Sequence, residues 1–276
     1  MIIDSHQHYW NKALFNYPWL TPESGCLYRA FEPRDLIPLA RENNVVKTVV
    51  VQAMSSCEET AWLLKLADQN ELIGGVVGWV DLKSGNVAEK LAEFARNPKF
   101  KSVRHQIEDE PNREWILQSE VLTSLKAAEK AGIAFDVLMK HDQLWQVREV
   151  REKCPDLRMV IDHAAKPDIK HGEFAPWASH LKTAAQYVDM CKLSGLFTEA
   201  DHATWEKEDI RRYFDFVLET FGTDRVMFGS DWPVSTMASN YSRTVHTSLE
   251  LCAELSETER QKVFFENAKS FYKIDV

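Results

Sequence analysis

Short runs of apolar residues, rich in valine and isoleucine, recur along the whole chain. Eight such runs occupy residues 2–8, 45–53, 73–80, 101–107, 133–139, 157–163, 187–195 and 225–231. They lack the clean alternation of polar and apolar positions that marks a half-exposed strand. This pattern favours strands buried on both faces of a parallel sheet, with buried helices as the alternative.

Amphipathic stretches follow these runs. Their apolar residues recur at steps of three and four, as in EETAWLLKLADQN at 58–70 and VAEKLAEFAR at 87–96, which is typical of helices packed on a sheet. Similar stretches lie at 33–43, 119–131, 143–152, 175–185, 208–221 and 256–271. The regular alternation predicts an α/β fold of the TIM-like (β/α)₈ barrel type, because no glycine-rich nucleotide-binding turn supports a doubly wound sheet.

The connections between these elements contain no linker rich in proline, glycine or serine, so we expect one barrel domain over residues 1–276. The connection at 9–32 is exceptional in its length and its aromatic content. Long connections in compact domains usually serve a function. We therefore expect this segment to be ordered and to cover the mouth of the barrel.

The composition excludes several classes of function. The 276 residues carry a formal net charge of -9, which opposes binding to nucleic acid. The five cysteines form no C-x-x-C pair and predict neither a disulfide framework nor a thiolate zinc site. The opening MIIDSHQHYW lacks the features of a signal peptide, and no run reaches the roughly 18 apolar residues of a membrane span. We expect a cytoplasmic protein.

Polar residues close several of the predicted strands, and the active site of a (β/α)₈ barrel lies at these carboxyl ends. The candidates are His6 and His8, then Arg104, His105 and Gln106, then Asp162 and His163, then Lys192 and Ser194, and finally Ser230 and Asp231. Side chains alternate between the two faces of a strand. On this ground we expect His105 and Asp162 to point away from the site.

His6 and His8 stand two residues apart, so both imidazoles project from one face and can converge on one ion or one carbonyl oxygen. Alternatively, they hydrogen-bond to neighbouring loops. With His163 and Asp231 they would provide the nitrogen and oxygen ligands that suit Zn²⁺. Taken alone, His163 is more often a buried core residue, and Asp231 is as readily a turn cap as a catalytic residue.

Five segments resemble one known family: DSHQHYW at the start, VRHQIEDEP at 103–111, VIDHAAKPDI at 160–169, CKLSGL at 191–196 and MFGSDWPV at 227–234. They are similar to the amidohydrolase superfamily, and more narrowly to its amidohydrolase-2 type lactonases. This group contains L-fuconolactonase, L-rhamnonolactonase and 2-pyrone-4,6-dicarboxylate lactonase. The resemblance implies a distorted (β/α)₈ barrel that opens a small lactone, with His6, His8, His163 and Asp231 at the reaction centre.

The resemblance also bears on the metal. Binuclear members of the superfamily use a carboxylated lysine on a central strand, whereas the fourth run here reads KSVRHQ and offers no such lysine. We expect at most one ion, bound by His6, His8, His163 and Asp231. Several members of the lactonase group work without a metal, so the same residues could hold the substrate carbonyl directly.

The roles of the remaining residues follow from lactone hydrolysis, in which a base takes a proton from water. We assign this role to Asp231, with His163 as the second catalytic candidate. Arg104 and Lys166 would orient substrate oxygens, with an interior ion pair as the alternative for Arg104 and a solvated side chain as the alternative for Lys166. Trp10, Trp79 and Trp232 stand at strand ends and would offer aromatic faces to a sugar ring, although core packing explains them equally well. His141, His171, His180, His202 and His246 are expected at the surface.

Two other functions remain open at this stage. The superfamily includes zinc-dependent, non-oxidative decarboxylases with nearly the same histidines and aspartate. A barrel could also bind a sugar acid without turning it over. The four residues His6, His8, His163 and Asp231 favour an enzyme, and the small number of cations at the strand ends favours L-fucono- or L-rhamnonolactone over a dicarboxylate lactone.

Overall fold

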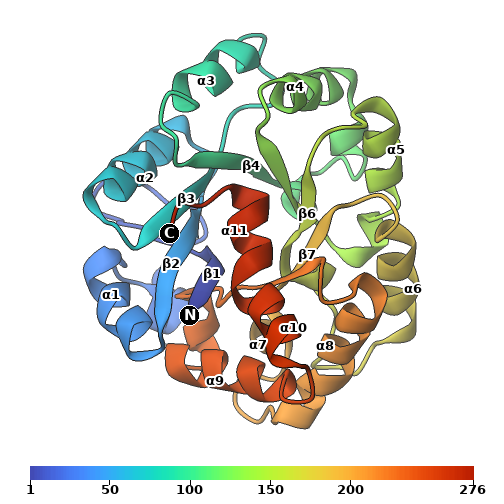
Figure 1. Ribbon diagram of the computed structural model, residues 1–276. Coiled ribbons are helices and arrows are strands. Elements are labelled where there is room, and N and C mark those ends of the chain that lie inside the picture. The colour runs from blue at the N-terminus through green and yellow to red at the C-terminus, as the bar shows by residue number, and fades with distance from the viewer.

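The structure is a computed structural model that describes residues 1–276, and it contains eight parallel strands in one sheet (Figure 1). The strands are β1 (Ile2–Gln7), β2 (Val45–Val51), β3 (Ile73–Gly78), β4 (Phe100–Gln106), β5 (Ala134–Leu138), β6 (Met159–Ile161), β7 (Met190–Leu193) and β8 (Val226–Phe228). Strands that follow one another in the sequence pair side by side. The predicted TIM-like barrel is confirmed, and each of the eight apolar runs overlaps one of its strands.

Helices surround the strands (Figure 1). They are α1 (Pro33–Glu42), α2 (Cys57–Gln69), α3 (Val87–Phe94), α4 (Ser119–Lys130), α5 (Gln146–Lys153), α6 (Ala175–Ala184), α7 (Leu196–Glu199), α8 (Lys207–Phe221), α9 (Tyr241–Leu251), α10 (Glu257–Gln261) and α11 (Asn267–Tyr272). Seven of the eight predicted helical stretches correspond to α1 to α6 and α8, whereas α7 and α9 were not expected. None of the helices is long and apolar enough to cross a membrane.

The stretch predicted at 256–271 is helical but has a different role from that expected. A π-helical turn at Lys262–Glu266 separates α10 from α11. In Figure 1, α11 lies across the centre of the barrel rather than in the outer ring. Its Phe271 and Tyr272 pack with strand residues such as Val49 and Val77 in one apolar cluster. This segment closes the end where the strands begin, and the opposite end is left for a site.

The seam between β1 and β8 is held by individual contacts rather than by a continuous ladder. Ser5 donates from its hydroxyl to the carbonyl of Phe228 (2.6 Å). Asp4 accepts from both the backbone N–H (2.8 Å) and the hydroxyl (2.5 Å) of Ser230. Burial raises the pKa of Asp4 to about 6, although these donors oppose the rise. The contacts bring the end of β8 against β1.

The segment 9–32 is ordered, as expected. Trp10 and Phe31 form an isolated antiparallel bridge, and a 3₁₀ turn at Pro22–Leu27 lies between them in the sequence. The indole N–H of Trp19 donates to the carbonyl of Ala53, just beyond β2 (2.8 Å). These contacts fix the segment over the carboxyl ends of the first strands.

Candidate active site

A cavity of about 470 Å³ opens at the carboxyl ends of the strands. This is within the usual size range of sites for small molecules. One part of its lining is apolar and includes Trp10, Trp19 and Leu27 from the covering segment. The other part is charged and polar, with Arg104 and Asp231 among its residues. The cavity therefore suits a small ligand that has both polar and apolar groups.

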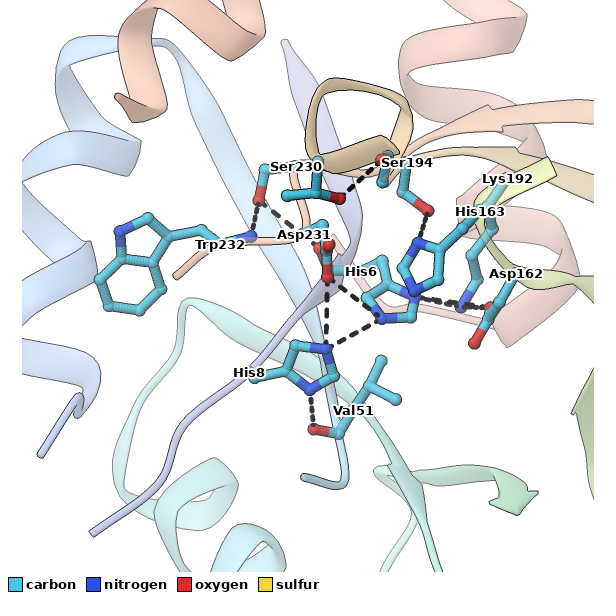
Figure 2. A network of polar contacts seen from close by, with 12 residues as sticks. His6, His8, Val51, Asp162, His163, Lys192, Ser194, Ser230, Asp231 and Trp232 are labelled. Carbon is cyan, nitrogen blue, oxygen red and sulfur yellow. Dashed lines mark hydrogen bonds and ion pairs between the residues drawn. The ribbon is translucent and has the colours of Figure 1, made fainter. Parts of the chain in front are cut away.

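His6, His8 and Asp231 lie together at the inner part of the site (Figure 2). The Nε2 atoms of His6 and His8 are 3.1 Å apart. An oxygen of Asp231 lies 3.4 Å from Nε2 of His8 and 3.9 Å from Nε2 of His6. All three side chains are almost completely buried. Three atoms with lone pairs therefore converge on one point.

The tautomer of His8 follows from its second nitrogen. Its Nδ1 lies 2.8 Å from the carbonyl oxygen of Val51, which can only accept a hydrogen bond. Nδ1 thus carries a proton, and in the neutral imidazole Nε2 has the lone pair that could bind an ion. A backbone carbonyl that orients an imidazole in this way is common around metal-binding histidines.

His163 reaches the same point from an unusual turn. The residues from His163 to Lys166 all have positive φ, between 48° and 58°. Left-handed backbone is costly for residues other than glycine and is concentrated at functional sites. The turn is stabilised by a hydrogen bond from the indole of Trp177 to the carbonyl of Ala164 (2.7 Å), and Ser194 contacts Nδ1 of His163 (2.9 Å).

Gly195 makes room for this arrangement. A Cβ at this position would lie 2.6 Å from Nδ1 of His163, and the φ of Gly195 is itself +71°. Burial lowers the pKa of His163 to about 4, with Asp231 acting in the opposite direction. The imidazole is therefore neutral near pH 7 and can serve as a ligand or as a proton acceptor.

Asp231 is the acidic member of the group. Burial raises its pKa, but the neighbouring His163 and His8 outweigh this effect and hold the pKa below the ordinary value for aspartate. Its φ is +56°, and its backbone N–H donates to the carbonyl of His6 (2.8 Å). The carboxylate is thus ionised and fixed beside the histidines.

The expectation for Asp162 was wrong. Its side chain is fully buried inside the barrel, where it pairs with His6 (3.4 Å), Lys192 (2.9 Å) and Arg104 (3.2 Å). The alternation argument fails because β6 ends at Ile161, and the turn that follows directs both Asp162 and His163 inward. Lys192 also pairs with Asp136 of β5 (2.5 Å), so the inner layer is a buried network of charges.

Arg104 is placed between this network and the cavity. One terminal nitrogen lies 3.3 Å from Nε2 of His6 and 3.2 Å from Asp162, and the other donates to the carbonyl of Gln52 (2.6 Å). Its Nε has no partner although it is buried. Arg104 is therefore both an interior ion-pair partner and a cation at the cavity wall. His105 points away, as expected, and stacks on Trp115 with centroids 3.9 Å apart.

Lys166 lines the cavity and pairs with Glu108 (2.5 Å). Burial lowers the pKa of Lys166, but Glu108 outweighs burial and raises the pKa above the ordinary value for lysine. The ammonium group is therefore charged at neutral pH. Both cations at the wall, Arg104 and Lys166, already have carboxylate partners.

The three tryptophans have different surroundings. Trp10 lines the cavity. Trp79 is outside it and donates from its indole to His105 (3.0 Å). Trp232 is also outside, with its ring against Tyr9 and Phe31. We therefore keep only Trp10 as a candidate for contact with substrate, because the other two are occupied by packing.

Several lining residues were not identified from the sequence. Glu108, Glu199 and His202 contribute side chains to the cavity, and Trp19 and Met237 add apolar surface. His202 is exposed, as expected, but it is exposed at the cavity rather than elsewhere. These residues lie on irregular connections, where neither strand alternation nor helical spacing indicates direction. The FTEADHATW segment after the seventh apolar run has no sequence pattern that predicts which of its side chains line the cavity.

The chemistry of the donor set fits one divalent cation. Ligand atoms of His6, His163 and Asp231 lie within 4.8 Å of one another, and Nε2 of His8 lies beside them. Zn²⁺ binds nitrogen and carboxylate oxygen at about 2.0–2.2 Å in a tetrahedron, which requires ligand atoms about 3.4 Å apart.

The histidines and the aspartate lie at the carboxyl ends of the barrel strands, where the active site of a TIM-barrel enzyme is found. The fold and the site therefore define a TIM-barrel enzyme. A sequence profile of the amidohydrolase family matches residues 3–274, and the chain belongs to this family. The resemblance noted in the sequence is thereby confirmed.

Individual relatives agree with this assignment. The L-fucono-1,5-lactonase of Burkholderia ambifaria is 37% identical over 99% of this chain and 96% of the relative. The L-fucono-1,5-lactonase of Burkholderia multivorans is 34% identical with the same coverage. A crystal structure of an amidohydrolase from Burkholderia multivorans with bound zinc is 34% identical and superimposes with a TM-score of 0.93 over 100% of both chains.

Proposed function

We propose that this protein opens the ring ester of a sugar-acid lactone, of the L-fucono- or L-rhamnonolactone kind, by attack of water on the ring carbonyl. The observation that carries the proposal is the Asp231 carboxylate, which is fixed among His6, His8 and His163 in a buried part of the cavity. The activity of the two relatives named as L-fucono-1,5-lactonases supports the same substrate class.

Asp231 acts as the base in this proposal. Its low pKa keeps it ionised, so it can accept a proton from a water molecule that attacks the carbonyl carbon. The attack places negative charge on the carbonyl oxygen. Arg104 lines the cavity, with a terminal nitrogen 3.3 Å from Nε2 of His6, and is a preorganised cation near this position; such groups contribute strongly to catalysis.

His6, His8, His163 and Asp231 would hold one divalent cation, and the proposal accommodates a site with or without it. When bound, Zn²⁺ would supply Lewis-acid polarisation of the carbonyl oxygen. Without it, the imidazoles would contact the substrate oxygen directly. In both cases Lys166 and the Trp10 face position the ring, since both line the cavity.

The charges at the wall favour a neutral, hydroxylated substrate. Arg104 is paired with Asp162, and Lys166 is paired with Glu108. A dicarboxylate would therefore face Asp231, Glu108 and Glu199 without a free cation to receive it. Hydroxyl groups can donate to these carboxylates and would be bound without added charge.

A decarboxylase of the same superfamily is the alternative enzyme, and its anionic substrate is disfavoured by the same excess of carboxylates. A barrel that only binds a sugar acid is the non-enzymatic alternative. A panel of sugar 1,4- and 1,5-lactones with a pH indicator, measured with and without chelator, separates these functions. We expect acid release with at least one sugar lactone. Release of CO₂ from a carboxylic acid, or thermal stabilisation by ligands that are never turned over, would contradict the proposal.

A further inference from the structure

The cavity has two walls of different chemical character. One wall follows the ends of β4, β6 and β7 and contains the charged side chains Glu108, Lys166 and Glu199. The other wall comes from the segment after β1 and the loop after β8. We call it the apolar wall, and it consists of Trp10, Trp19, Leu27, Val234 and Met237. A ligand in the cavity therefore meets charged groups on one side and apolar groups on the other.

The apolar wall is fixed by contacts on both sides of the barrel seam. Trp19 packs edge-to-face on Trp10, with ring centroids 4.9 Å apart. The 3₁₀ turn at Pro22–Leu27 lies against the 3₁₀ turn at Val234–Met237, which follows β8. The shape of the wall is thus set before a ligand binds.

The polar side-chain atoms in and beside this wall already have partners. The indole N–H of Trp10 donates to the carbonyl of Arg29 (2.8 Å), and that of Trp19 donates to the carbonyl of Ala53 (2.8 Å). Ser24 also lines the cavity, but its hydroxyl donates to the carbonyl of Trp19 (3.1 Å). A ligand hydroxyl placed here would lose its hydrogen bonds to water without gaining a free side-chain donor, which costs free energy.

Part of the apolar wall is in contact with water. Trp19 is 39% exposed and Met237 is 38% exposed, although most large apolar side chains of the protein are buried. Exposed apolar surface at a cavity marks a place where a ligand can cover it, and an apolar group gains most from this contact. The wall therefore favours an apolar substituent on the ligand.

The structure of a sugar 1,5-lactone matches these two walls. Its carbonyl carbon lies between C2 and the ring oxygen. C2, C3 and C4 carry hydroxyl groups, which can donate to Glu108 and Glu199 and accept from Lys166. When these hydroxyl groups face the charged wall, the ring oxygen and C5 face the apolar wall. The exocyclic carbon C6, which is attached to C5, then lies against the apolar wall.

We propose that the apolar wall receives C6 of the lactone and makes the enzyme selective for lactones of 6-deoxy sugars, in which C6 is a methyl group. This inference rests on the proposed lactone hydrolysis. Met237 is the specificity-determining residue, because it lies on the same loop after β8 as Asp231 and exposes its side chain to the cavity. The flexible thioether of methionine adapts well to a small apolar group.

Two matched pairs of substrates test the selectivity. L-Fucono- and L-galactono-1,5-lactone differ only in a hydroxyl group on C6, and so do L-rhamnono- and L-mannono-1,5-lactone. In whichever series the wild type opens, we expect kcat/KM to be about 10- to 100-fold higher for the 6-deoxy member. Equal or faster opening of the 6-hydroxy member would overturn the inference and leave the proposed function intact. A wild type that opens none of the four lactones would contradict the proposed function and this inference with it.

Met237→Gln tests the assignment to the apolar wall, because glutamine has a similar length but offers an amide to a hydroxyl group on C6. We expect the ratio of kcat/KM between the two members of a pair to fall by about 10-fold. Met237→Leu keeps an apolar surface and should keep the preference for the 6-deoxy member.

Leu14→Gln is the matched control, because it makes a similar apolar-to-amide change at an exposed residue of the same covering segment that does not line the cavity. Its rates with both members of a pair should equal those of the wild type. Melting temperatures of the three variants show whether they are folded. An unchanged ratio in folded Met237→Gln, or an equal fall of the ratio in Met237→Leu, would overturn the assignment of C6 to this wall.

Discussion

The backbone N–H of Asp231 donates a 2.8 Å hydrogen bond to the carbonyl of His6. These two residues are far apart in the sequence, and the bond joins the end of β8 to β1 where the barrel closes. The contact fixes the carboxylate relative to the imidazoles without using either side chain. The geometry of the site is therefore a direct consequence of barrel closure.

Gly195 offers a test of how closely His163 must be held. Gly195→Ala would place a Cβ 2.6 Å from Nδ1 of His163, so we expect a large loss of activity in addition to lower stability. Gly132→Ala is the matched control, because Gly132 has a similar φ of +68° with nothing within 4 Å. Both variants incur about 1–2 kcal/mol for left-handed backbone. Kinetics and thermal melts of the two proteins should separate strain from displacement of His163, and equal activities would contradict this account.

Lys192 provides a test of the buried network. Lys192→Met would leave Asp136 and Asp162 without the ammonium group that pairs with both. Removal of one partner from a buried ion pair typically costs about 3–5 kcal/mol, and we expect a loss of stability in this range from urea denaturation. Lys207→Met removes the exposed pair with Glu250 and should cost less than about 1 kcal/mol. Similar losses of unfolding free energy in the two variants would show that burial of the ion pair does not determine the destabilisation.

Glu59 predicts a pH dependence of stability. It is buried on α2, accepts from the backbone N–H groups of Ala53 and Met54, and burial raises its pKa to about 7 from the ordinary 4.5. The folded state therefore binds a proton more tightly than the unfolded state does. The contribution of Glu59 to the free energy of unfolding should decrease as pH rises from about 4.5 to about 7, by on the order of 3 kcal/mol at most.

Glu59→Gln should remove the part of this dependence that Glu59 contributes, because the amide oxygen can still accept both hydrogen bonds but does not titrate. We expect the variant to be more stable than the wild type at pH 8 and similar to it at pH 5, as measured by chemical denaturation. Glu58→Gln changes an exposed neighbour and should keep the slope of the wild type. If the free energy of unfolding of the wild type minus that of Glu59→Gln rises over this interval, the direction of the pKa shift is contradicted.

The metal content can be measured directly. We expect protein prepared with zinc and then desalted to retain at most one ion per chain, and to lose it in His163→Gln, since His163 belongs to the ligand group. Intact mass should show no carboxylated lysine, because the amine of Lys192 is engaged by two carboxylates. Two ions per chain, or one ion that persists in His163→Gln, would contradict the site.

The barrel could be predicted because strands buried on both faces give apolar runs that need no alternation to be recognised. His6, His8, His163 and Asp231 could be placed at one mouth for the same reason. The direction of Asp162 could not, because it depends on β6 ending at Ile161 and on a left-handed turn after it.

Other parts of the site have no signature in the sequence. Glu199 lines the cavity from a short helix on a connection. Trp79 lies outside the cavity, where its indole N–H donates to His105. The segment at 256–271 has the spacing of an outer helix, and only its packing against Val49 and Val77 reveals that it closes the barrel. These outcomes depend on tertiary contacts rather than on local pattern.

The most direct test of the account is the turnover of Asp231→Asn on the lactone that the wild type opens best. Asparagine keeps the size of the side chain but removes the base. We expect kcat to fall by about 10²- to 10⁴-fold, while substrate affinity and the melting temperature change little. Turnover near the wild-type rate in a folded Asp231→Asn protein would show that Asp231 does not activate water.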